Sequence, residues 1–475
     1  MPNRRLVART SLAQLEPRFA EIRAQEGIHE ERSAGVVAEL AHGGHDAEPA
    51  HIEGERADLT GLPFVTIDPE GSTDLDQALL IVADGDGWRV RYAIADVAAH
   101  VTPGGAIDTE AWARVETTYC PDTRIGLHAP EMSEGYASLL QGQRTKAVVW
   151  DLGVDAEGEL QTIDVRRAWV RSARQYSYEQ LTTAPPQDAA ELLANLKSLG
   201  DARRSALARA GAVSLPKPSQ EVVRKGDQLT LEFRAGRPIE DDNAQVSLLT
   251  GSAAARLMLE AGVGVLRTMP PASEASLQRL RLQAAALGVD WAPDESYAHV
   301  LTTLDVESPR GAAFLTAAVS LFRGAAWQPF DVAAGVPAPD PVTHGALAAP
   351  YAHVTAPLRR LVDRYGTEVC LAHVAGRKVP EWAATALPGL GTAMEVGVKR
   401  GNRIDKACVD AVESAVLAPH VGEMFEGVGL DSNTVQLSAP AVVARCSGTV
   451  TVGRRQRVTL VSADAATGPK FEAVS

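Results

Sequence analysis

The spacing of apolar and polar residues divides the chain into stretches of different periodicity. Near the start, Leu12, Leu15, Phe19 and Ile22 recur at three- and four-residue intervals, which predicts a helix with one apolar face. A second amphipathic piece over residues 30–42 predicts another helix, so the pair could form a helix-turn-helix. The polar stretch that follows predicts a linker.

Strand patterns dominate from residue 62 to about 170. Residues 88–101 are rich in β-branched and aromatic side chains, and a turn at residues 156–158 predicts a hairpin. Helical periodicity then occurs in residues 188–210, 244–286, 356–374 and 392–417. The end of the chain switches to short β runs separated by turns, the pattern of a small antiparallel barrel.

These patterns predict a multidomain α+β protein. We expect a short helical N-terminal domain over residues 1–60, a large mixed α/β domain over residues 61–418 and a β-barrel over residues 419–475. An apolar content of 45% in 475 residues is ample for packed cores.

Composition also narrows the expected location of the protein. The sequence contains no run of about 18 apolar residues, so no membrane span is expected. Its N-terminus has basic residues but no continuous apolar segment, which argues against secretion. The 4 cysteines lie far apart, without a C-x-x-C pair, and favour a reducing cytoplasm.

A net charge of −14 argues against a surface with general affinity for nucleic acids. It leaves room for a local basic channel, since arginines and lysines cluster at residues 359–360, 399–403 and 454–457. Each cluster could equally be a solvated surface.

Three aspartates lie close together in the segment FVTIDPEGSTDLDQALL. An apolar run predicts a strand ending at Asp68, a Gly-Ser loop follows, and Asp74 and Asp76 come two residues apart. Carboxylates this close repel one another unless a cation lies between them, and Mg2+ prefers such oxygen ligands. Taken alone, the motif could also be a solvated acidic turn or the D-x-D of a metal-dependent glycosyl transferase.

The same segment resembles the signature of the ribonuclease II and ribonuclease R (RNB) family of exoribonucleases. Further motifs follow in the family's order: YAIADVAAHV, TTYCPDTRIGLHAPEMSEGYASL and, far downstream, HGALAAPYAHVTAPLRRLVD. The C-terminal barrel resembles the family's OB-fold RNA-binding domain. The resemblance covers residues 62–475, and the two halves of the expected site lie hundreds of residues apart, which makes it specific.

The resemblance implies roles for individual residues. Asp68 and Asp74 match metal-binding aspartates, and Asp76 matches the one that orients the attacking water or the terminal sugar. Arg359 matches the arginine that stabilises the transition-state phosphate with its rigid fork of donors. Tyr119 matches the aromatic that stacks on a nucleotide near the 3′ end. Without the resemblance, Arg359 could be an ordinary helix-surface arginine and Tyr119 a core residue.

Further RNA contacts are expected by the same resemblance. They fall on Arg360, Thr355, Pro357, Tyr351 and Gln245.

The chain departs from the family pattern in three ways. The fourth aspartate is replaced by Gln77, whose amide oxygen could still ligate a metal but carries no charge, so affinity for a second Mg2+ should fall. Gln245 stands where the family has a glutamate. The N-terminal 60 residues are too few for the two cold-shock domains usual in the family, so a short form is expected.

The function implied is that of a Mg2+-dependent, processive 3′→5′ exoribonuclease acting in RNA turnover. It would hydrolyse single-stranded RNA to nucleoside 5′-monophosphates, as a cytoplasmic monomer without a nucleotide cofactor, and Mn2+ could replace Mg2+. One alternative is a catalytically silent RNA-binding protein of the same fold, suggested by Gln77 and Gln245. A nuclease acting on DNA is a third reading, because no short motif records selection for the 2′-hydroxyl.

Overall fold

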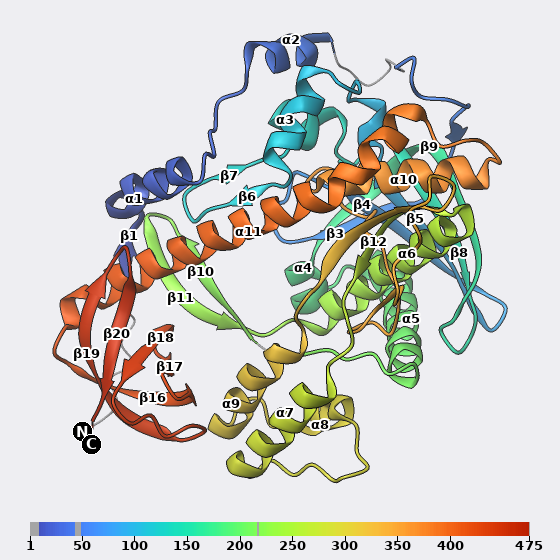
Figure 1. Cartoon of the computed structure of the whole chain (residues 1–475). Helices are drawn as coiled ribbons and strands as arrows, with labels where there is room; N and C mark the ends of the chain where they lie inside the picture. The colour runs from blue at the N-terminus through green and yellow to red at the C-terminus, as the bar shows by residue number, and fades with distance from the viewer. Residues whose placement is uncertain (1–8, 43–48, 216–217, 475) are drawn as a thin grey trace.

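A computed structural model describes residues 9–42, 49–215 and 218–474 (Figure 1). At its centre lies a six-stranded sheet in the order β2-β9-β3-β4-β5-β8. Its strands are β2 (Ala57–Asp58), β3 (Phe64–Asp68), β4 (Gln77–Asp84), β5 (Gly87–Ala95), β8 (Arg144–Val154) and β9 (Leu160–Ser177). The long β9 pairs antiparallel with β8 along its first part and parallel with β3 along its last, so it joins both ends of the β3–β4–β5–β8 series.

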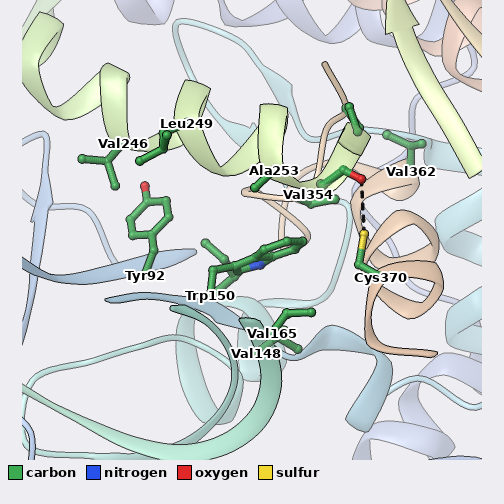
Figure 2. Close-up of a cluster of buried hydrophobic side chains, with 14 of the residues drawn as sticks. Tyr92, Val148, Trp150, Val165, Val246, Leu249, Ala253, Val354, Val362 and Cys370 are labelled. Atoms are coloured by element: carbon green, nitrogen blue, oxygen red, sulfur yellow. Dashed lines mark hydrogen bonds between the residues drawn. The ribbon is translucent and has the colours of Figure 1, made fainter. Parts of the chain in front are cut away.

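Helices cover this sheet and bury its apolar face. They are α3 (Ala106–Arg114), α4 (Tyr178–Thr183), α5 (Ala190–Arg209), α6 (Pro238–Ala261) and α10 (Leu361–Val374). Tyr92 of β5 and Trp150 of β8 point toward α6, where Leu249 lies above them (Figure 2). The Cys370 thiol of α10 donates a hydrogen bond to the carbonyl of Ala254 in α6, with sulfur and oxygen 3.6 Å apart.

The helix α11 (Glu381–Leu417) ties the sheet to the C-terminal barrel. At a rise of 1.5 Å per residue its 37 residues span about 55 Å. Leu387 and Met394, in its first half, belong to the core beside the sheet. Cys408 and Val412, in its second half, belong to a second core shared with the barrel. Because one helix supplies both cores, the barrel is held in a fixed position relative to the sheet.

The barrel is closed and has five strands in the order β16-β17-β18-β20-β19. They are β16 (Met424–Asp431), β17 (Thr434–Ser438), β18 (Ala441–Ser447), β19 (Arg455–Asp464) and β20 (Gly468–Ala473). Apolar and polar residues alternate along β17 and β18, so one side of each strand fills the interior. The α+β class and the terminal β-barrel predicted from the sequence are therefore confirmed.

Smaller elements complete the fold. The hairpin of β10 (Ser219–Lys225) and β11 (Gln228–Arg234) pairs with β1 (Thr10–Ser11). Three helices, α7 (Glu274–Leu287), α8 (Tyr297–Thr303) and α9 (Pro309–Ala318), form a small apolar cluster of their own, and α9 packs on β16. The remaining strand pairs are β6 (Thr118–Tyr119) with β7 (Arg124–Ile125), β12 (Val263–Thr268) with β13 (Ala326–Asp331), and β14 (Thr343–His344) with β15 (Ala349–Pro350).

The two N-terminal helices do not form the helix-turn-helix that their sequence allowed. The predicted apolar face of α1 (Leu12–Gln25) is buried, and α1 packs on α11 beside the barrel. In contrast, α2 (Ala34–His42) packs on α3 and buries Val36 there. Figure 1 shows the two helices well apart. The prediction failed because each apolar face finds a different partner.

A second correction concerns residues 244–286, where the sequence predicted helix throughout. Gly262, at φ +71°, ends α6 in the left-handed conformation. The strand β12 follows before α7 begins, and it pairs with the distant β13. A long-range strand partner here overrides the local helical pattern. In the part of the chain that the structure describes, no helix is long and apolar enough to cross a membrane.

We predict that replacing Trp150 with alanine destabilises the protein strongly. The Trp150 side chain is fully buried between the sheet and α6, and truncating such a residue costs about 3–5 kcal/mol. Urea unfolding followed by far-UV circular dichroism measures the loss. The matched control is Val336→Ala, whose side chain is 48% exposed, and its unfolding midpoint should hardly move. Equal midpoints for the two variants would contradict this account of the core.

Candidate active site

Two segments that are distant in sequence meet at the edge of the sheet. One is the loop between β3 and β4, and the other is the loop that precedes α10. The Leu358 N–H donates to Oδ1 of Asp76 at 2.7 Å, across 282 positions of the chain. Beside it, Nε2 of Gln77 donates to the carbonyl of Thr355 at 2.6 Å. These two hydrogen bonds bring the aspartates and Arg359 into one site.

The conformation of the first loop follows from its sequence. The apolar β3 ends at Asp68, and Gly71 turns the chain at φ +79°, where a side chain would be strained. The Ser138 hydroxyl then accepts from the Leu75 N–H and donates to the Thr73 carbonyl. The loop is therefore fixed by hydrogen bonds before any ligand binds.

Asp68 and Asp74 form the acidic half of the site. Oδ2 of Asp68 is buried and has no hydrogen-bond partner among the described residues. Burial, and then the nearby Asp74 carboxylate, raise the pKa of Asp68 to about 7. One oxygen of Asp74, Oδ1, is paired with Nη1 of Arg124 at 2.5 Å. A buried carboxylate oxygen without a donor is a site at which a cation would be favourable.

Asp76 lies in a different environment, beside Arg359. Its side chain is buried, and Oδ2 lies 3.6 Å from Nε of Arg359. Burial raises the pKa of Asp76 to about 8, although the Arg359 charge and the Leu358 N–H act in the opposite direction. The Arg359 side chain is 49% exposed, so its remaining donors are available to a phosphate.

Gln77, predicted as a possible metal ligand, is hydrogen-bonded at both ends of its amide. Its Oε1 accepts from the hydroxyl of Tyr92 at 2.7 Å, while Nε2 is bound to Thr355. Tyr92 is buried, and burial raises the pKa of its hydroxyl, which therefore stays protonated as the donor. Both ends of the amide are therefore bound within the protein, and Gln77 links β5 to the loop that precedes α10.

Tyr119 projects from β6 on the outer side of the site. Its side chain is 52% exposed, and it lies close enough to Arg359 for the two groups to affect each other's pKa. An exposed aromatic ring beside an arginine is suited to stacking on a base. The alternative of an ordinary core residue does not apply, because the ring is not buried.

Four of the residues expected to contact RNA lie in or next to the loop that precedes α10. Arg360 donates two hydrogen bonds to the buried Asp363, and Asp363 also accepts from the Ala356 N–H. Thr355 is buried, Pro357 lies in the same turn, and Tyr351 packs so closely on α6 that a Cβ on Gly251 would overlap its ring. The structure thus places these residues mainly as the walls of the site.

A cavity of about 290 Å³ opens beside these loops. Its walls include Gln77, Tyr178, Asn243, Ser247, Tyr351, Thr355, Arg359 and Arg360. Gln245 is on the same helix, α6, and is buried, with Oε1 lacking a partner among the described residues. A larger cavity, of about 610 Å³, lies between α5 and α6; neither cavity is lined by the three aspartates, and only the smaller one includes Arg359.

Sequence reasoning missed three residues of this site. Arg124 lies opposite Tyr119 in the β6–β7 pair, and their presence in one short hairpin segment was a usable signal. Tyr178 accepts a hydrogen bond from Asn243 at 2.8 Å in the cavity wall. Nothing local in the sequence marks Tyr178 or Asn243, because only the packing of α4 on α6 brings them together.

The donor set fits a cation held by few protein ligands. Within residues 9–42, 49–215 and 218–474, no group of three or more histidine, cysteine, aspartate or glutamate side chains is arranged to hold a metal. The unpartnered oxygen of Asp68, with Asp74 beside it, nevertheless fits the way Mg2+ binds. That ion commonly takes one or two carboxylates and completes its shell with water and substrate phosphate.

Comparison with known proteins gives the family. The model of the RNB domain matches residues 56–372, well over half of the chain. The model of the RNase II-type exonuclease C-terminal S1 domain matches residues 424–474, which form the closed barrel.

Curated relatives share part of the sequence. An exoribonuclease 2 of Yersinia pseudotuberculosis is 28% identical over 369 residues, which is 73% of this chain and 54% of the relative. An uncharacterized ribonuclease of Synechocystis is 28% identical over 243 residues, or 48% of this chain and 35% of the relative. The chain thus spans about half or less of the length of these relatives.

Solved structures share the fold. The apo form of Mycoplasma genitalium RNase R superposes with a TM-score of 0.84 at 19% identity, over 96% of this chain and 78% of that one. Yeast Ssd1, described as a pseudonuclease, superposes with a TM-score of 0.67 at 13% identity, over 90% of this chain and 55% of that one. The aspartate and arginine motifs predicted the RNB family, and the match of the RNB domain to residues 56–372 confirms it. The chain therefore belongs to the RNB family of ribonuclease II and ribonuclease R.

Proposed function

We propose that this protein is a divalent-metal-dependent 3′→5′ exoribonuclease that degrades single-stranded RNA processively to nucleoside 5′-monophosphates. The observation that carries the proposal is the junction of Asp76 with Leu358 and Arg359, next to the unpartnered oxygen of Asp68. Family membership and the exoribonuclease among the relatives support the reaction class.

The site contains the chemistry that phosphodiester hydrolysis requires. The reaction needs an oriented water and neutralisation of the charge that develops on the phosphate. Arg359 would bind the scissile phosphate with the donors that face the cavity. Asp76 would orient the attacking water, or the terminal ribose, through Oδ2, the oxygen that Leu358 does not use.

Asp68 and Asp74 would hold Mg2+, and Mn2+ could take its place. When bound, the ion would neutralise phosphate charge and make its bound water more acidic. The Asp68 carboxylate favours this role because it is buried near Asp74 and its Oδ2 has no hydrogen-bond partner among the described residues.

The RNA would enter along Tyr119 and end in the cavity. Stacking on an exposed tyrosine contributes about 1–3 kcal/mol per base and ignores base identity, which suits a nuclease without sequence preference. Tyr351, Thr355, Pro357, Arg360 and Gln245 would shape the wall around the terminal nucleotides. The closed barrel, matched by the S1 domain model, would bind RNA further from the site. A monomer acting in the cytoplasm fits this proposal.

A second candidate is an RNA-binding protein of the same fold without activity. Gln77 favours it, because the amide replaces a carboxylate where the family has one. The Ssd1 superposition also illustrates that the fold accommodates a pseudonuclease. Asp68, Asp74, Asp76 and Arg359 argue for activity, since a silent protein has no need to keep buried carboxylates beside an arginine.

The decisive measurement is a gel time course on a 5′-labelled unstructured RNA, with Mg2+ and then with EDTA. We expect metal-dependent shortening to a product of a few nucleotides with few intermediates. A matched DNA oligomer should remain intact. RNA that stays intact in Mg2+ yet shifts in a binding assay would favour the silent protein.

Asp76→Asn should abolish turnover while leaving RNA binding nearly unchanged. The amide oxygen can still accept from Leu358, so the loop is retained, but the charge facing Arg359 is lost. Single-turnover cleavage and a filter-binding titration measure the two effects separately. Cleavage at the normal rate would refute the role assigned to Asp76.

Arg359→Ala should slow cleavage by a factor of about 10² or more, and weaken RNA binding far less. The expected cause is loss of the donors that stabilise the transition-state phosphate. Arg166→Ala is a matched control, since the Arg166 side chain is also 49% exposed and pairs with Asp164 on the sheet. Comparable losses of activity in both variants would show that the effect is not specific to the site.

A further inference from the structure

We infer that Arg124 serves as a fixed positive charge of the active site, so that the protein binds one divalent cation, at Asp68, and not two. The inference rests on the proposed function, because it concerns the charges around the same reacting phosphate. Its basis is the pairing of Arg124 with Asp74, which no motif in the sequence had indicated.

Arg124 is held from two sides. Nη1 lies 2.5 Å from Oδ1 of Asp74, and Nη2 lies 2.5 Å from Oε1 of Glu134. The other oxygen of Glu134 accepts from the Thr73 hydroxyl at 2.8 Å, so the pair is anchored to the aspartate loop itself. Because the guanidinium is fixed in advance, it loses little conformational freedom in keeping this position.

The pairing leaves ligands for a single ion. Oδ1 of Asp74 is occupied by the guanidinium, which would repel a divalent ion placed on that side. The Gln77 amide is bound to Tyr92 and Thr355 and brings no charge. Oδ2 of Asp68 has no partner among the described residues, and with the second oxygen of Asp74, which the Arg124 pairing does not use, it could hold one ion that also binds water and phosphate.

Arg124 therefore contributes a charge that does not depend on metal concentration. An arginine stays protonated at every working pH, so Asp74 keeps a cationic partner whether or not a metal is bound. The same arginine orients Asp74, and its hairpin also carries Tyr119. We assign it as a positioning residue that replaces part of the charge a second ion would bring.

Equilibrium binding of Mn2+ to the intact chain, measured by the electron paramagnetic resonance signal of free Mn2+, tests this inference without requiring turnover. We expect one ion per chain and none for Asp68→Asn. Arg124→Gln should bind Mn2+ about tenfold more tightly, because a nearby positive charge is removed, while cleavage falls. Arg124→Lys should keep the wild-type Mn2+ affinity, since the charge is retained.

Two comparisons make the result decisive. Arg89→Gln, which removes an arginine from Asp151 on the sheet, should leave both Mn2+ affinity and cleavage unchanged. Thermal melting identifies variants that fail to fold. If Arg124→Gln does not fold, the test uses Arg124→Lys. Two ions in the wild-type protein, or an unchanged or weaker Mn2+ affinity in folded Arg124→Gln, would overturn the inference. One bound ion in a protein that cleaves no RNA would instead refute the proposed function alone.

Discussion

The site depends on one buried contact, in which the Asp76 carboxylate accepts the N–H of Leu358. Asp76 comes just before the first residue of β4, and Leu358 lies in the turn before α10, so the contact joins the sheet to a helix that arrives late in the chain. A buried charge without partners is very costly, and a hydrogen bond to a charged group contributes about 1.5–3 kcal/mol. The carboxylate for which we propose a role in the chemistry therefore also holds the loop that carries Arg359 in place.

Gln77 makes the same junction from the neighbouring position, and its chemistry explains why an amide suits it. The Tyr92 hydroxyl offers a donor and the Thr355 carbonyl offers an acceptor, and one glutamine side chain satisfies both. An aspartate here would be shorter, and it would turn a carboxylate oxygen toward the Thr355 carbonyl without a donor. Gln77 therefore has a structural role at this position, and its presence does not by itself imply that the protein has lost activity.

Much of this architecture could be predicted from local patterns, and the exceptions share one cause. The strand that ends at Asp68, the apolar face of α1 and the terminal barrel follow from periodicities within single segments. The strand β12, the separation of α1 from α2 and the pairing of Arg124 with Asp74 depend on partners elsewhere in the chain. Motif resemblance predicted residues that the structure brings together, such as Asp76 and Arg359, but it could not say which of their atoms have partners within the chain.

The groups that surround Asp68 differ from those that surround Asp76. Burial raises the pKa of both Asp68 and Asp76, to about 7 and about 8, yet their surroundings differ. Both oxygens of Asp76 have a donor group nearby, since Oδ1 accepts from Leu358 and Oδ2 lies 3.6 Å from Nε of Arg359. Asp68 lies near the Asp74 carboxylate, which Arg359 opposes only in part, and its Oδ2 has no partner among the described residues. Two carboxylates eight positions apart therefore differ, because of the two only Asp68 has a buried oxygen without a hydrogen-bond partner among the described residues, at which a cation would be favourable.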